Sequence, residues 1–183
     1  MHRLRSNESN SYFHLNPDTT TIEGTVVTLG TNTYLPLDST GIPTGSIEPY
    51  PSIKSNTPFT LGPSEPDLDD CFLMNPHPSS IPLDTRPLPL RTLATLYHPS
   101  TDLHLEVQST EPAFQFYTGK YIDVPELTTE DGRKVPRRGP RSGLCVEPSR
   151  YVNCAGREEW RAMCLLRKGG VWGARNVYVA WKG

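Results

Sequence analysis

The spacing of proline most constrains what this chain can fold into. Nineteen prolines are spread over 183 residues, and eleven of them fall between positions 43 and 89. Proline removes a backbone donor and clashes with the preceding helical turn, so long helices cannot form there. Short strands joined by turns are compatible with prolines at this spacing. The sequence therefore predicts an all-β fold, and its length suits a single domain over residues 1–183.

Charge and cysteine content exclude several classes of function. The chain carries 18 basic and 20 acidic residues, a net charge of −2, so no overall field attracts nucleic acid or an anionic membrane. Its longest apolar run falls far short of a bilayer span, and its first residues lack the apolar core of a secretory signal. The four cysteines show no C-x-x-C spacing, which argues against a metal site and favours the reduced thiols of a cytoplasmic protein.

Alternating apolar residues predict the strands. The clearest pattern is a hairpin of residues 92–97 and 103–108, in which Leu103, Leu105 and Val107 point to one face. Many short strands with few helices indicate a sandwich of two sheets. Further strands are expected over residues 21–29, 32–36, 113–118, 144–146 and 175–181, an irregular connection over 46–68, a polar loop over 123–141, and a helical turn or two near 158–163.

A glutamate follows a short apolar strand near the C-terminal end. Residues 143–147 read Gly-Leu-Cys-Val-Glu. A glutamate in such a place is more often a solvated strand end than a functional group. Leu144 and Val146 are expected to withdraw Glu147 from water, and a desolvated carboxylate has a raised pKa that suits proton transfer. Glu147 is therefore a candidate catalytic base.

Two upstream segments carry further polar groups. Residues 114–119 read Phe-Gln-Phe-Tyr-Thr-Gly, and residues 69–72 read Asp-Asp-Cys-Phe. The amide of Gln115 offers both a donor and an acceptor, although a strand glutamine can simply face solvent. Asp69 is the first candidate for a binding residue, and its neighbour Asp70 is the reserve choice. Both follow a proline-rich stretch and could equally belong to a turn. Asp69 and Glu147 could also form the carboxylate pair of a glycoside hydrolase.

Taken in this order, the segments resemble those of the aldose 1-epimerases, or galactose mutarotases. The resemblance includes Ser-Tyr-Phe-His-Leu at residues 11–15 and runs from about residue 10 to residue 181. It implies the C-terminal part of a large twisted β-sandwich that lacks its N-terminal strands, with a sugar cleft on the open face of one sheet. It also implies a metal-free and cofactor-free enzyme that interconverts the α and β anomers of a free hexose such as galactose or glucose.

The resemblance assigns roles to four residues. Glu147 would take the proton from the anomeric hydroxyl, while Asp69 and Gln115 would hold sugar hydroxyls. Asn10 stands where the family has the histidine that protonates the ring oxygen. An amide can bind that oxygen but cannot deliver a proton near neutral pH, so a catalytically impaired sugar-binding module is the alternative. His14 could stand in for that acid, although four strand residues span about 13 Å.

Two further expectations concern partners. Basic residues between positions 133 and 141 could meet a phosphate, as in the related hexose-6-phosphate epimerases, but without interleaved aromatic residues a solvated loop is favoured. A sandwich without its opening strands would expose unpaired sheet edges. Self-association, or binding of a partner fragment, is therefore expected.

Overall fold

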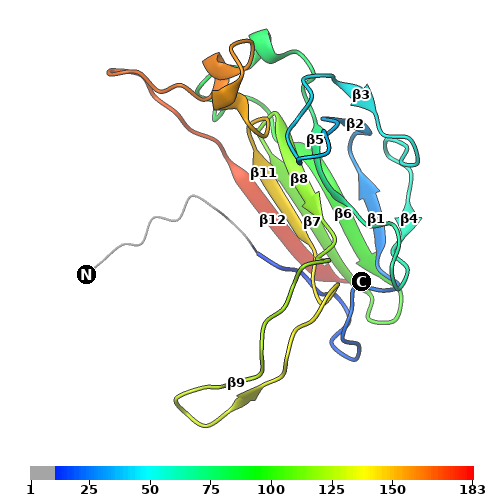
Figure 1. Cartoon of the computed structure of the whole chain (residues 1–183). Coiled ribbons are helices and arrows are strands. Elements are labelled where there is room, and N and C mark those ends of the chain that lie inside the picture. Colours follow the sequence, from blue (N-terminus) through cyan, green and yellow to red (C-terminus); the bar gives the residue numbers. More distant parts are fainter. Residues whose placement is uncertain (1–10) are drawn as a thin grey trace.

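The computed structural model describes residues 11–183, and the all-β prediction is confirmed (Figure 1). Two antiparallel sheets of five strands pack face to face, and a two-stranded arm projects from them. Asn10 lies outside the described residues. Within residues 11–183, no helix is long and apolar enough to cross a bilayer.

The predicted hairpin forms the centre of the first sheet. β6 (Arg91–His98) pairs with β7 (Leu103–Ser109) in antiparallel register, with Leu96 opposite Leu105. β1 (Val26–Leu29) and β4 (Phe59–Thr60) extend the sheet beside β6, and β12 (Asn176–Lys182) extends it beside β7. Leu105 and Val107 are buried in the core, as the alternation predicted.

The second sheet is centred on β8 (Ala113–Tyr117). It pairs on one side with β5 (Asp69–Leu73) and on the other with β11 (Cys145–Ser149). Beyond β5 lie β2 (Thr33–Tyr34) and β3 (Glu48–Pro49). Side chains at alternate positions of one strand face opposite sides of a sheet. The second sheet therefore presents one set of side chains to the core and another to the outside.

The core lies between the two sheets. Phe72 of β5 and Phe114 of β8 are fully buried, and their rings stack with centroids 5.7 Å apart. Val146 of β11 packs into the same cluster. A smaller cluster under the C-terminal loops contains Tyr151 and Trp160, whose rings meet edge to face at 5.3 Å. Burial of these aromatic side chains is the main favourable term for such a small sandwich.

Several local predictions are corrected by the structure. Residues 46–68 are not wholly irregular, because they contain β3 and β4, which are too short to show an alternating pattern. Asp69 begins strand β5 instead of lying in a turn, since pairing with β8 overrides its low strand propensity. The remaining short elements are β9 (Leu127–Thr128) and β10 (Lys134–Val135) in the arm formed by residues 123–141, and the single 3-10 turns η1 (Pro78–Ser80), η2 (Cys154–Gly156) and η3 (Arg161–Met163).

Candidate functional site

A polar row crosses strands β5, β8 and β11 on the face of the sheet turned away from the core. Antiparallel register sets Gln115 opposite Cys71 on one side and opposite Glu147 on the other. Asp69 lies two residues before Cys71 and shares its face. The Gln115 side-chain nitrogen Nε2 donates a hydrogen bond of 2.7 Å to Asp69 Oδ1. Asp69, Gln115 and Glu147 are thus brought together on one face, although Asp69 and Glu147 lie 78 positions apart in the sequence (147 − 69).

A cavity of about 440 Å³ opens over this row. Its volume falls within the range of roughly 300–1,000 Å³ usual for small-molecule sites. It contains three of the four residues predicted from the sequence, and the fourth, Asn10, is not described. The lining residues are Asp69, Gln115 and Glu147 together with Leu37, Gly41, Cys71, Ser149 and Val152.

The surroundings of Glu147 differ from the sequence expectation. Leu144 and Val146 do not cover its carboxylate, because the strand alternation sends both into the core on the opposite face. Cys145 lies on the same face, two positions before it. Burial, and then the negative charge of Glu147, raise the pKa of the Cys145 thiol to about 12. The thiol therefore stays protonated and donates a hydrogen bond to Glu147, while the Tyr12 hydroxyl donates to the Cys145 sulfur.

Two polar atoms of the site have no hydrogen-bond partner among the described residues. These are the amide oxygen Oε1 of Gln115 and the hydroxyl oxygen of Ser149, both almost inaccessible. A buried polar atom without a partner costs about 1–3 kcal/mol. The carboxylates of Asp69 and Glu147 line the cavity and can accept hydrogen bonds from the hydroxyl groups of a polyhydroxylated molecule.

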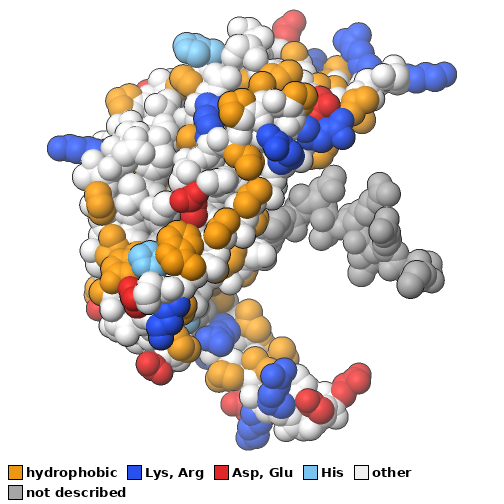
Figure 2. Space-filling view, turned by 180° about the vertical axis from the view of Figure 1, so that it is seen from behind, with side chains coloured by type: hydrophobic (Ala, Val, Ile, Leu, Met, Phe, Trp, Pro, Cys, Tyr) orange, Lys and Arg blue, Asp and Glu red, His pale blue; other side chains and the backbone are white. Residues whose placement is uncertain are grey.

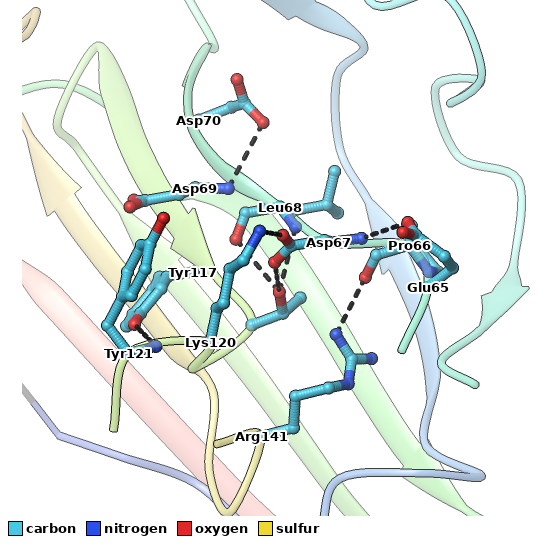
Figure 3. Close-up of polar contacts among 11 residues, drawn as sticks. Glu65, Pro66, Asp67, Leu68, Asp69, Asp70, Tyr117, Lys120, Tyr121 and Arg141 are labelled. Atoms are coloured by element: carbon cyan, nitrogen blue, oxygen red, sulfur yellow. Dashed lines mark hydrogen bonds and ion pairs between the residues drawn. The ribbon is translucent and has the colours of Figure 1, made fainter. Parts of the chain in front are cut away.

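Three neighbouring aspartates meet different environments (Figure 3). Only Asp69 among them lines the cavity. Asp67 accepts hydrogen bonds from Lys120 at 2.5 Å and from Thr118 at 3.3 Å. Asp69 and Asp70 point in different directions, and Asp70 hydrogen-bonds with Tyr50. Burial raises the pKa of Asp70, partly opposed by its hydrogen bonds. Of these two adjacent aspartates, Asp69 is the one that lines the cavity, and its role in holding a ligand stays a prediction.

Several cations of the basic segment make contacts within the chain. Arg137 pairs with Asp123 at 2.7 Å, and Lys134 with Glu126 at 3.8 Å. Arg141 donates to the carbonyl oxygen of Pro66 at 3.2 Å (Figure 3). It also donates to that of Gly62 at 3.0 Å and so secures the loop before β5. These contacts favour a structural role for this segment over phosphate binding.

A second, larger cavity of about 590 Å³ lies where the arm meets the N-terminal segment. Its lining includes His14, Tyr121 and Arg138 and shares no residue with the cavity of Glu147. His14 makes a hydrogen bond of 3.1 Å with Thr19, and burial lowers its pKa. His14 therefore lies in a different cavity from the candidate base, which gives no support to the idea that it replaces the missing acid.

The sequence analysis missed two neighbours of Glu147, the buried Cys145 and the cavity-lining Ser149, that the strand pattern could have supplied. Cys145 and Ser149 stand two positions before and after Glu147, so a strand through Glu147 must place all three on one face. Val152 and Leu37 come from loops, and their approach to the site is fixed only by tertiary packing.

Comparison with known proteins identifies the family of this chain. The family described as aldose 1-epimerase matches residues 10–179. The bifunctional protein gal10 of Schizosaccharomyces pombe is 37% identical over 171 residues, which cover 93% of this chain and 22% of that protein. Human galactose mutarotase is 30% identical over 164 residues, covering 88% of this chain and 45% of that protein.

A solved structure shows the same fold. A crystal structure of the GalM/aldose epimerase homologue from C. elegans superposes with a TM-score of 0.63 at 15% identity, covering 91% of this chain and 48% of that one. The chain therefore belongs to the aldose 1-epimerase family and has a galactose-mutarotase-like fold. It spans about half the length of human galactose mutarotase and about a fifth of gal10.

Proposed function

We propose that this chain binds a free hexose over β5, β8 and β11 and interconverts its α and β anomers. The observation that carries the proposal is the meeting of Asp69, Gln115 and Glu147 in one cavity on the outer face of the sheet. Membership of the aldose 1-epimerase family supports the reaction class, and galactose or glucose is the proposed substrate. Its free cysteines, with no disulfide in the described chain, fit action in the reducing cytoplasm.

Each residue of the row has a distinct part in the proposed reaction. Glu147 accepts the proton of the C1 hydroxyl as the ring oxygen gains a proton and the C1–O5 bond breaks. The resulting aldehyde rotates about C1–C2 and closes on its other face, which returns the protons and inverts the anomer. Asp69 and Gln115 hold sugar hydroxyls in place, and such positioning supplies a large share of catalysis. The reaction moves only protons and needs no cofactor.

Asn10 favours a second candidate function, that of a sugar-binding module with little catalytic activity. The family's acid histidine is replaced here by an amide, which cannot itself protonate the ring oxygen near neutral pH. Loss of a general acid typically lowers a rate about 10²- to 10⁴-fold. The chain is accordingly expected to be a slow mutarotase, and Asn10→His is expected to accelerate it.

Proton NMR of freshly dissolved α-galactose tests the proposal. The purified chain should accelerate decay of the α-anomeric signal, and Glu147→Gln should return it to the rate without protein. Glu48→Gln, an exposed carboxylate on β3 of the same sheet, is the matched control and should be fully active.

The remaining outcomes separate the alternatives. Galactose binding without acceleration, followed by acceleration in Asn10→His, would identify an impaired binding module. Release of the chromophore from a chromogenic galactoside would instead indicate a hydrolase. A folded chain that neither binds galactose nor changes its anomerisation rate would contradict the proposal.

A further inference from the structure

The two five-stranded sheets of the described chain have four edges, and three of these are protected against pairing with another strand. β3 and β4 have only two residues each; β3 contains Pro49, and β4 directly follows Pro58. The edge of β11 contains Pro148, and Phe13 covers its beginning by exchanging hydrogen bonds of 2.8 and 3.0 Å with Leu144. Short strands, prolines and covering segments are the devices by which proteins block edge-to-edge association.

The fourth edge, β12, has none of these protections. It runs for seven residues, Asn176–Lys182, contains no proline or acidic residue, and pairs with β7 alone among the described strands. It lies at the margin of its sheet in Figure 1. On its outer face Val179 and Trp181 are 44% and 43% exposed, and Figure 2 shows hydrophobic side chains gathered on that face of the molecule.

The flanking hydrogen bonds fix which backbone groups of β12 face outward. Thr110 N–H donates to the Arg175 carbonyl at 3.0 Å, and Gly183 N–H donates to the Asp102 carbonyl at 3.1 Å. The backbone groups of Arg175 and Gly183 therefore point toward β7. Because the direction alternates along an antiparallel strand, the N–H and C=O groups of Ala180 and Lys182 point away from β7, toward the free side.

We propose that β12 pairs in antiparallel fashion with β12 of a second copy of this chain, about a twofold axis at Val179. The five-stranded sheet that contains β12 would then continue into the same sheet of the second copy. Such an interface is self-complementary, as twofold symmetry requires. The dimer would leave the cavity of Glu147 in the other sheet uncovered, so this inference does not depend on the proposed hexose chemistry.

The sequence of β12 suits a copy of itself. With Val179 on the axis, Trp181 lies opposite Val177 of the second copy, so the apolar outer faces form one stripe. Lys182 lies opposite Asn176, so no like charges meet across the ladder, where they would destabilise it. The backbone N–H and C=O of Ala180 point away from β7, so they are available for hydrogen bonds to the second copy.

Light scattering after size exclusion measures the association. The chain has a mass of 20.4 kDa, and its apparent mass should rise toward twice that value as concentration increases. A single strand pair is a small interface, so the dimer should dissociate on dilution. Ala180→Pro removes an N–H that β7 does not use, so it should remain folded by circular dichroism and stay monomeric. Leu127→Lys, an exposed apolar position on the arm, should still dimerise.

A cysteine pair tests the register. Directly opposed residues of an antiparallel pair have Cα atoms about 4.5–5.5 Å apart, within disulfide range. Val179→Cys should therefore give a covalent dimer on treatment with oxidised glutathione. Val177→Cys, whose counterpart would lie about 13 Å away along the strand, is the matched control and should not. The unsubstituted chain, with Cys164 partly exposed, sets the background.

The outcomes decide the inference. A wild-type chain that is monomeric at every concentration would overturn it, as would a dimer that Ala180→Pro leaves intact. Equal cross-linking at positions 177 and 179 would show random collision and would also contradict the pairing. Loss of dimer in Ala180→Pro, together with cross-linking at 179 alone, would establish it.

Discussion

The two faces of the β5–β8–β11 sheet differ although they are built from the same three strands. One face carries Phe72, Phe114 and Val146, all fully buried. The other carries Gln115 and Glu147, which line a cavity, beside Cys71, which is buried in the smaller cluster. A strand alternates with a period of two, so each of these core residues has a sequence neighbour on the outer face. Stability and ligand chemistry are thereby placed on adjacent residues, and single substitutions can separate them.

The largest expected effect is on the core face. Phe114→Ala should lower the free energy of unfolding by about 3–5 kcal/mol, the usual cost of truncating a buried phenylalanine. Gln115→Ala, one residue further along but on the outer face, should change stability far less. Chemical denaturation monitored by circular dichroism compares the two variants. Equal losses would show that the two faces do not divide stability from function as described.

A smaller effect is expected at the start of β5, on the outer face. Asp69→Asn removes a charged acceptor from the cavity while leaving an amide of similar size. Hydrogen bonds to charged groups contribute about 1.5–3 kcal/mol, so the dissociation constant for galactose should rise about 10- to 100-fold. Titration calorimetry measures this change. Unaltered affinity would remove Asp69 from the site.

The smallest effect is expected at the adjacent carboxylate. Burial raises the pKa of Asp70 above its ordinary value of 3.8, so the folded chain binds this proton more tightly than the unfolded chain does. The Asp70 contribution to stability is therefore greatest at acid pH and declines as pH rises from the ordinary value through the raised one. Asp70→Asn should remove this decline and modestly stabilise the chain at neutral pH, with galactose affinity unchanged.

Thermal unfolding across a pH series checks this expectation. A parallel pH dependence in wild type and Asp70→Asn would show that the group titrates normally. Reduced galactose affinity in Asp70→Asn would place it in the site together with Asp69.

The sequence predicted those elements whose alternation extends over many residues. The β6–β7 hairpin and β8 were found for this reason, and β12 nearly to its observed bounds. β3 and β4 were not found, because two residues carry no period and their pairing depends on distant partners.

The site shows the same division between local and distant information. Asp69, Gln115 and Glu147 could be chosen from short motifs, and their meeting follows from the register of three strands. The cover of Glu147 was assigned to Leu144 and Val146, which are its neighbours in sequence but point to the core. The contact with Cys145 and the approach of Tyr12 depend on side-chain packing, which the sequence does not specify.

An amide NMR titration with galactose tests most directly the claim that the outer face of this sheet binds a hexose. We expect the side-chain amide signals of Gln115 to shift in a saturable way, together with backbone signals of β8 and β11, whether or not turnover is fast. Signals near His14 and Tyr121, in the larger cavity, should move little. Shifts confined to that larger cavity, or no saturable shift at Gln115, would contradict the account.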